Sequence, residues 1–227
     1  MEANIRAIAL MRSDFPTKFG IPRQSGLVDA LRSPIVVEPE FRNPAALRGI
    51  EEFSHLWLIW QFSEAVRKDW SPTVRPPRLG GNTRMGVFAT RSPFRPNNLG
   101  LSCVRLLGVE ETEKFGTVLH VGGADLMDGT PIFDIKPYIP YSDARPEASG
   151  GFTDRTGDFL LNVDFPDKLL ELLPEDKRIA VIGVLSHAPR PSYQNDSERV
   201  YGMNFAGCNI RFKVSGTDLT VIDIEKF

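Results

Sequence analysis

Short apolar runs separated by turn residues fill the first 140 residues, and no long helical pattern interrupts them. Runs rich in β-branched and aromatic residues, bounded by Gly, Pro, Asn and Asp, are typical of strands. The predicted strands cover residues 5–11, 33–39, 53–62, 86–90, 101–109, 118–126 and 132–138. Many short strands without long helices between them favour a barrel or a sandwich, in which each strand can bury one face.

The run at residues 53–62, FSHLWLIWQF, is apolar at consecutive positions. Such a run predicts a central strand that is buried on both faces. A long loop is expected over residues 13–29, which contain two prolines and two glycines, and a short helical turn over 44–49. Cys103 lies in an apolar run and is expected to be a small core residue.

The character of the chain changes after a polar stretch, residues 141–157, which holds two adjacent glycines and no apolar period. Beyond it, two short helices are predicted at 167–173 and 178–185, followed by a hairpin around Gly216. The predicted fold class is therefore mainly β. We expect a β-barrel-like N-terminal domain over residues 1–141, a linker over 142–158 and a small α+β C-terminal domain over 159–227.

Positive charge is concentrated in one segment, although the net charge of the chain is −2. Seven basic residues stand against one acid between Arg67 and Arg95, and the stretch 70–98 has five arginines but no lysine and no acid. Arginine binds phosphate or carboxylate with two hydrogen bonds and stacks on bases. This asymmetry indicates a nucleic-acid or phosphate partner. The alternative is a basic surface loop without a partner.

Several common sites are absent from the sequence. It contains no GxGxxG dinucleotide fingerprint, Walker loop, HExxH or GxSxG motif. His55, His120 and His187 are far apart without ligand spacing, which disfavours a metal site and favours structural roles. No apolar run approaches the roughly 20 residues that cross a bilayer, and no signal-peptide pattern opens the chain, so we expect a cytoplasmic protein. Two cysteines are too few for a disulfide framework.

Three loop clusters are candidates for ligand binding. IPRQSG, residues 21–26, has a turn that projects polar groups, and LMDGTPIFDIKPY, residues 126–138, follows a strand with an Asp-Gly turn. The second cluster is either a hairpin connection alone or a rigid turn that holds a small polar ligand. Asp125, Asp128 and Asp134 do not have the spacing of an EF-hand. The third cluster, HAPRPSYQND, places an arginine near a tyrosine, a pair that can hold a phosphate and stack a base.

These clusters resemble the TrmO family, also called TsaA-like. The resemblance is carried by PRQSGLV, RGIEEFSHLWLIWQF, WSPTVRPPRLGGNTRMGVFATRSPFRPNNLGLS, DLMDGTPIFDIKPYIPY and APRPSY. It covers most of the first 141 residues and resumes in the C-terminal domain. It implies a β-barrel methyltransferase that uses S-adenosylmethionine to methylate N6 of threonylcarbamoyladenosine, next to the anticodon of tRNA. It also implies a homodimer with the methyl donor near the subunit interface.

The resemblance assigns site residues. The S-adenosylmethionine site is expected to comprise Pro22, Arg23, Gln24, Ser63, Glu64, Arg91, Leu101, Asp128, Gly129, Thr130 and Pro131. Relatives carry His-Gln where this chain has Ser63-Glu64, and an acid where it has Ala188. The predicted tRNA-binding residues are Arg75, Arg78, Arg84, Arg95, Arg190 and Tyr193. For the first four of these, contact with the dimer partner and support of their own loop are the alternatives.

Methyl transfer from a sulfonium requires N6, the methyl carbon and sulfur in line, with water excluded. Because the N6 lone pair is delocalised, a proton acceptor is also needed. The residues alone do not assign that acceptor. A competing interpretation is a non-catalytic tRNA-binding or regulatory protein on the same barrel, which would bind no donor. A third is methylation of a small molecule, which the local positive charge disfavours.

Overall fold

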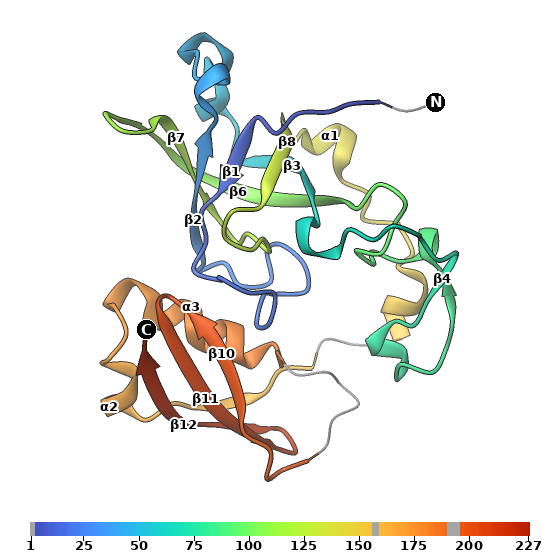
Figure 1. Cartoon of the computed structure of the whole chain (residues 1–227), viewed down its shortest axis with the longest axis vertical. Coiled ribbons are helices and arrows are strands. Elements are labelled where there is room, and N and C mark those ends of the chain that lie inside the picture. The colour runs from blue at the N-terminus through green and yellow to red at the C-terminus, as the bar shows by residue number, and fades with distance from the viewer. Residues whose placement is uncertain (1–2, 156–158, 190–195) are drawn as a thin grey trace.

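The structure is a computed structural model that describes residues 3–155, 159–189 and 196–227 (Figure 1). A closed barrel forms from β1 Ala9–Met11, β2 Arg32–Val37, β3 His55–Gln61, β6 Leu99–Thr112, β7 Gly116–Gly122 and β8 Pro131–Pro137. The strand order is β1-β2-β7-β6-β3-β8, and every neighbouring pair is antiparallel. The predicted mainly β fold class is confirmed.

Alternation along β3 places Leu56, Leu58 and Trp60 in the barrel core, whereas Trp57 and Ile59 are only partly buried on the outer face. The expectation that this strand is buried on both faces is therefore wrong, because a closed barrel has a single interior. The strand is central, as predicted, since it pairs with both β6 and β8. Cys103 is partly buried and lies opposite Trp57, not in the core as predicted.

Short turns and strands fill the long connections of the barrel. They are η1 Pro39–Phe41, η2 Pro44–Leu47, η3 Ile50–Glu52, η4 Ser63–Ala65, β4 Thr73–Val74, η5 Pro77–Leu79, β5 Met85–Gly86 and η6 Val87–Ala89. Two short helical segments, α1 Pro140–Asp143 and η7 Gly151–Arg155, follow the last barrel strand. The helical turn predicted at 44–49 is confirmed by η2. The strand predicted at 86–90 is wrong beyond Gly86. The carbonyl of Val87 accepts the Thr90 N–H at 3.2 Å and its hydroxyl at 2.9 Å, which closes a turn.

The C-terminal part of the chain is an α+β unit. It contains β9 Asn162–Asp164, α2 Asp167–Leu170, α3 Glu175–Ser186, β10 Tyr201–Phe205, β11 Cys208–Ser215 and β12 Asp218–Lys226. The sheet order is β10-β11-β12-β9, and Gly216 turns the β11–β12 hairpin with φ of 59°, as predicted. Neither β9 nor β10 was predicted from the sequence. The predicted helix 178–185 is confirmed within α3.

The β1–β2 connection, residues 12–31, contributes to the hydrophobic core of the C-terminal unit. Phe15, Val28 and Leu31 are buried in that core, and the Phe15 ring meets Phe205 edge-on at 5.1 Å between ring centroids. Figure 1 shows this connection between the barrel and α3. The connection therefore joins two barrel strands along the chain, but its buried side chains pack into the core of the C-terminal unit. The domain boundaries predicted from the sequence stay a prediction.

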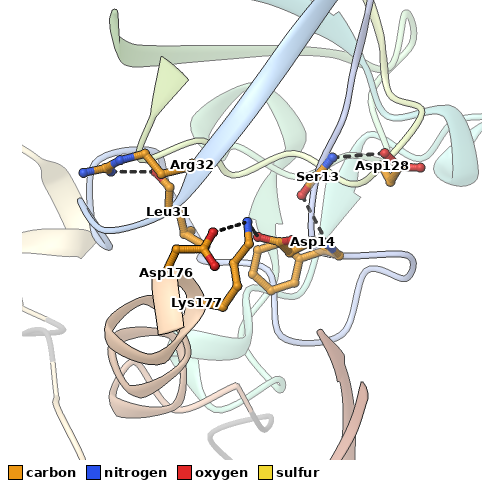
Figure 2. A network of polar contacts seen from close by, with 8 residues as sticks. Ser13, Asp14, Leu31, Arg32, Asp128, Asp176 and Lys177 are labelled. Carbon is orange, nitrogen blue, oxygen red and sulfur yellow. Dashed lines mark hydrogen bonds and ion pairs between the residues drawn. The ribbon is translucent and has the colours of Figure 1, made fainter. Parts of the chain in front are cut away.

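An ion pair joins the same connection to α3 (Figure 2). Lys177 Nζ lies 2.7 Å from Asp14 Oδ2, and the two side chains are only 20% and 17% exposed. One residue earlier, the Ser13 N–H donates to Asp128 Oδ1 at 3.0 Å. The segment thus links the C-terminal helix to the Asp-Gly turn between β7 and β8.

Lys177→Met is expected to lower the free energy of unfolding by about 1–3 kcal/mol, because it leaves the poorly exposed carboxylate of Asp14 without its partner. The temperature midpoint of unfolding, measured by circular dichroism, should fall by several degrees. Lys213→Met is the matched control, since Lys213 pairs with Glu198, whose side chain is 85% exposed. That pair should contribute close to nothing. Equal midpoints for the two variants would contradict the prediction.

Candidate functional site

Three connections meet at one end of the barrel: β1–β2 (12–31), β3–β6 (62–98) and β7–β8 (123–130). Each barrel strand is antiparallel to both neighbours, so the ends of β1, β3 and β7 coincide with the starts of β2, β6 and β8. All residues predicted to bind the methyl donor lie on these connections or just inside β6 and β8. The closed topology therefore gathers segments that are far apart in sequence.

Gln24 and Arg91 are brought together from two of these connections. The Arg91 guanidinium donates through Nη1 to Gln24 Oε1, and Gln24 Nε2 donates to the Arg23 carbonyl at 2.5 Å. Arg23 in turn donates through Nη2 to the Ala188 carbonyl at 3.4 Å, just after α3. Pro22 is buried, whereas both arginines are exposed. Pro22 thus packs inside the protein, while the guanidinium groups of Arg23 and Arg91 face solvent.

The Asp-Gly turn is braced against β1 and the segment after it. The Asp128 N–H donates to the Phe15 carbonyl at 2.9 Å, and the Gly129 N–H donates to the Met11 carbonyl at 2.8 Å. Gly129 has φ of 74°, a left-handed conformation that costs glycine nothing. The buried Thr130 hydroxyl donates to the Met127 carbonyl at 2.8 Å. The turn, which ends where β8 starts at Pro131, is a rigid element and not an open hairpin tip.

Ser63 and Glu64 lie in η4, directly after β3, and both are exposed. Asn98, which the sequence analysis missed, ties this turn to the arginine segment. It is buried with φ of 49°, and its Nδ2 donates to the carbonyls of Pro93 at 2.7 Å and Ala65 at 3.3 Å. The only sequence signal was an Asn-Asn pair after a proline, a composition typical of turns.

Asp125 is the second residue that the sequence analysis missed as part of the site. Its Oδ1 accepts the Ser102 hydroxyl at 2.5 Å, and Ser102 Oγ accepts the Trp60 indole N–H at 2.9 Å. Burial raises the pKa of Asp125 to about 6, against hydrogen bonds from Ser102 and from backbone N–H groups and the positive charge of Arg91. A strongly shifted carboxyl at a loop cluster is typical of functional sites.

The remaining arginines of the 67–95 segment differ in their exposure and in their hydrogen bonds. Arg75 and Arg84 are exposed, and Arg78 is partly buried. Arg95 instead donates through Nη1 to the carbonyls of Thr90 at 2.6 Å and Val87 at 3.2 Å, so its contacts support its own loop. Predicted residues Arg190 and Tyr193 lie outside the described residues.

Exposed aromatic side chains accompany these cations. Trp70 is 51% exposed and Phe88 is 72% exposed, and their ring centroids lie 6.0 Å apart. The guanidinium of Arg67 lies over the Phe94 ring at 3.7 Å from its centroid. Cationic groups and open aromatic faces on one segment suit the binding of a single-stranded nucleic acid, whose phosphates and bases they match.

Each of the three histidines has a polar neighbour within hydrogen-bonding distance. The contacts are His55 with Ser54 Oγ at 2.9 Å, His120 with Glu110 at 2.7 Å, and His187 with the Leu27 carbonyl at 3.0 Å. Within residues 3–155, 159–189 and 196–227, no group of three or more His, Cys, Asp or Glu side chains could hold a metal ion. In the same part of the chain, no helix is both long and apolar enough to span a bilayer.

The fold defines a closed antiparallel barrel protein with three connections clustered at one barrel end and an appended α+β unit. Residues 10–144 match the tRNA-methyltransferase O N-terminal domain, and residues 160–227 match the TrmO C-terminal domain. The chain belongs to the TrmO family.

Individual relatives agree with this assignment. The chain is 39% identical over 226 residues to a tRNA (adenine(37)-N6)-methyltransferase of Escherichia coli K12, with 96% of each chain covered. A crystal structure of TrmO from Pseudomonas aeruginosa superposes with a TM-score of 0.81 at 32% identity, covering 100% of this chain and 98% of that one. A Pyrococcus abyssi relative named a probable S-adenosyl-L-methionine-binding protein is 37% identical over 150 residues, 66% of this chain and 76% of its own length.

Proposed function

We propose that the protein is an S-adenosylmethionine-dependent tRNA (adenine(37)-N6)-methyltransferase that acts on N6 of threonylcarbamoyladenosine. The observation that carries the proposal is the gathering of all the predicted donor residues at one barrel end, beside a segment rich in arginine, in a member of the TrmO family. The E. coli relative is named for the same reaction at adenine 37. The threonylcarbamoyl group is the finer part of the proposal and comes from the family resemblance.

The residues at the barrel end fit a methyl donor with a charged amino-acid end and an adenosine. Arg91 would bind the donor carboxylate with two hydrogen bonds. The exposed Leu101 side chain would pack against an apolar face of the donor, and the braced turn at Asp128 and Gly129 would offer polar groups. The donor, when bound, supplies an electrophilic methyl group. The protein's part is to align N6 with that methyl and to exclude water.

Exposed cations and aromatic rings of the β3–β6 connection would hold the anticodon loop. Arg75 and Arg84 would contact phosphates, while Trp70 and Phe88 would stack on unpaired bases. Arg190 and Tyr193 are proposed for the same partner. Phosphate contacts fix position without reading sequence and weaken as salt concentration rises. Choice among tRNAs would therefore depend on the modified adenosine and its neighbours.

A homodimer acting in the cytoplasm completes the proposal. Large apolar side chains that are 51% to 72% exposed lie on the β3–β6 connection and at the start of β6: Val66, Trp70, Phe88 and Leu101. A second copy would cover such side chains, whose exposure is otherwise unfavourable. Leu101 belongs to both this set and the predicted donor site, which agrees with a donor near the subunit interface. Light scattering of the purified chain tests the dimer, and a monomer at micromolar concentration would count against it.

Transfer of a labelled methyl group tests the activity. The protein is incubated with labelled S-adenosylmethionine and with tRNA that either carries or lacks the threonylcarbamoyl group. We expect label only in the modified tRNA, at adenine 37. Absence of label from both tRNAs would contradict the enzyme assignment, and equal label in both would contradict the proposed substrate.

Calorimetry with S-adenosylmethionine separates the enzyme from the competing assignment. A non-catalytic tRNA-binding protein on the same barrel would bind tRNA but show no donor affinity. An enzyme that methylates a small molecule would bind the donor but leave both tRNAs unlabelled.

A further inference from the structure

Asp125 lies between β7 and β8 at the loop end of the barrel, and its hydrogen bonds have a fixed direction. The Trp60 indole N–H donates to Ser102 Oγ, and the Ser102 hydroxyl donates its own proton to Asp125 Oδ1 when the carboxyl is ionised. Oδ1 of the ionised carboxylate is therefore an acceptor.

The same carboxyl holds the β1–β2 connection. The Ser25 backbone N–H donates to the Asp125 carboxylate, while Ser25 Oγ accepts the Cys103 N–H at 3.1 Å. The next residue, Gly26, donates its N–H to the Gly123 carbonyl at 2.8 Å. Asp125 thus joins the segment that carries Pro22, Arg23 and Gln24 to the strands of the barrel.

Arg91 is the charged group that acts on Asp125. The other groups that face the carboxyl are neutral: Ser102 on β6, with Trp60 on β3 behind it, and Ser25 on the β1–β2 connection. In the described structure the Arg91 guanidinium donates to Gln24 and not to Asp125. The negative charge therefore attracts Arg91 without accepting a hydrogen bond from it, so the N–H groups that do not donate to Gln24 can bind a ligand.

We propose that ionised Asp125 is a positioning residue of the donor site, which holds the 22–26 turn through Ser25 and draws Arg91 toward the place of the donor carboxylate. This inference rests on the proposed function. Protonation of the carboxyl would remove the charge that attracts Arg91 and weaken the acceptor of the Ser25 N–H. Affinity for S-adenosylmethionine should therefore depend on the ionisation of this one carboxyl.

The pH dependence separates this role from a purely structural one. Because burial raises the pKa of Asp125 from 3.8 to about 6, the folded state holds the proton more tightly than the unfolded state does. The contribution of Asp125 to the free energy of unfolding is therefore most favourable below about pH 4 and is lost as pH rises through about 6. Donor affinity should change in the opposite direction, since it needs the charged form.

Isothermal titration calorimetry with S-adenosylmethionine, from about pH 5 to about pH 8, tests the proposal. In the unaltered protein, donor affinity should be constant above about pH 7 and should fall by up to about tenfold per pH unit below pH 6. Asp125→Asn should bind about tenfold more weakly at about pH 7.5 and lose most of this pH dependence, while its midpoint of thermal unfolding is unchanged or raised.

Two further variants sharpen the test. Ser102→Ala removes a hydrogen bond that lowers the pKa of Asp125, so it should move the midpoint of the affinity profile to higher pH. Asp134→Asn is the matched control, because Asp134 lies on β8 with its side chain 45% exposed and pairs with Lys136. It should behave as the unaltered protein does.

Equal affinities and equal pH profiles for Asp125→Asn and the unaltered protein would overturn the inference. So would an affinity loss accompanied by a lowered unfolding midpoint, which would show that the carboxyl only supports the fold. Failure of the unaltered protein to bind the donor at any pH would instead overturn the proposed function, and this inference with it.

Discussion

Arg91→Ala should weaken S-adenosylmethionine binding by about ten- to a hundredfold, which corresponds to about 1.4–2.8 kcal/mol. The substitution removes the guanidinium that meets Gln24 at the junction of two barrel connections and that is placed to bind the donor carboxylate. Arg91 is exposed, so the stability of the fold should change little. Calorimetry with the donor measures the affinity, and circular dichroism measures the unfolding midpoint.

Arg211→Ala provides the comparison for this variant. Arg211 lies on β11 and pairs with Asp223 and Glu225, so the same change of residue type is made outside the site. Its donor affinity should equal that of the unaltered protein. If Arg91→Ala keeps full donor affinity but loses tRNA binding, then Arg91 contacts tRNA and not the donor. The assignment of Arg91 to the donor would then be wrong.

Gly100→Ala should destabilise the protein by about 3 kcal/mol or more, the upper part of the range for overpacked cores. A Cβ at Gly100 would lie under 3.0 Å from ring atoms of Trp60, which stands opposite it across the β3–β6 pair. The indole cannot move away cheaply, because it is 6% exposed and bonded to Ser102. Thermal unfolding should occur several degrees lower, and donor binding should weaken because Ser102 supports Asp125.

Gly108→Ala is the control on the same strand, since a Cβ there would meet nothing within 4 Å. Its unfolding midpoint should match or slightly exceed that of the unaltered protein, because alanine has less conformational freedom to lose on folding. A midpoint for Gly100→Ala close to that of Gly108→Ala would show that the barrel accommodates the methyl group, and that Trp60 is not tightly packed.

Elements that depend on local chemistry were predictable from the sequence. The Gly216 hairpin and the helix within α3 carry their signals within a few residues, as does the barrel strand at 53–62. The prediction failed where side-chain hydrogen bonds decide the backbone. Residues 87–90 form a turn because Val87 accepts bonds from Thr90 and Arg95, and the side chain of Arg95 approaches from eight positions away.

The donor residues were named from motifs, but the polar groups that support them were not. Asn98 and Asp125 act through carbonyls, hydroxyls and N–H groups of other segments, and those partners cannot be read from spacing. Asp125 was considered only as a metal ligand, and its sequence neighbourhood gives no sign of Trp60 or Ser102 below it.

By itself, the sequence determined the mainly β class, the uneven charge and the family, because residue types and short motifs carry these properties. Only the tertiary structure decided that three distant connections share one barrel end and that a carboxyl there is partly buried. Antiparallel closure sets the first, since it brings together strand ends from across the chain. Burial sets the second, since the pKa of Asp125 depends on the solvent and charges that the folded chain places around it.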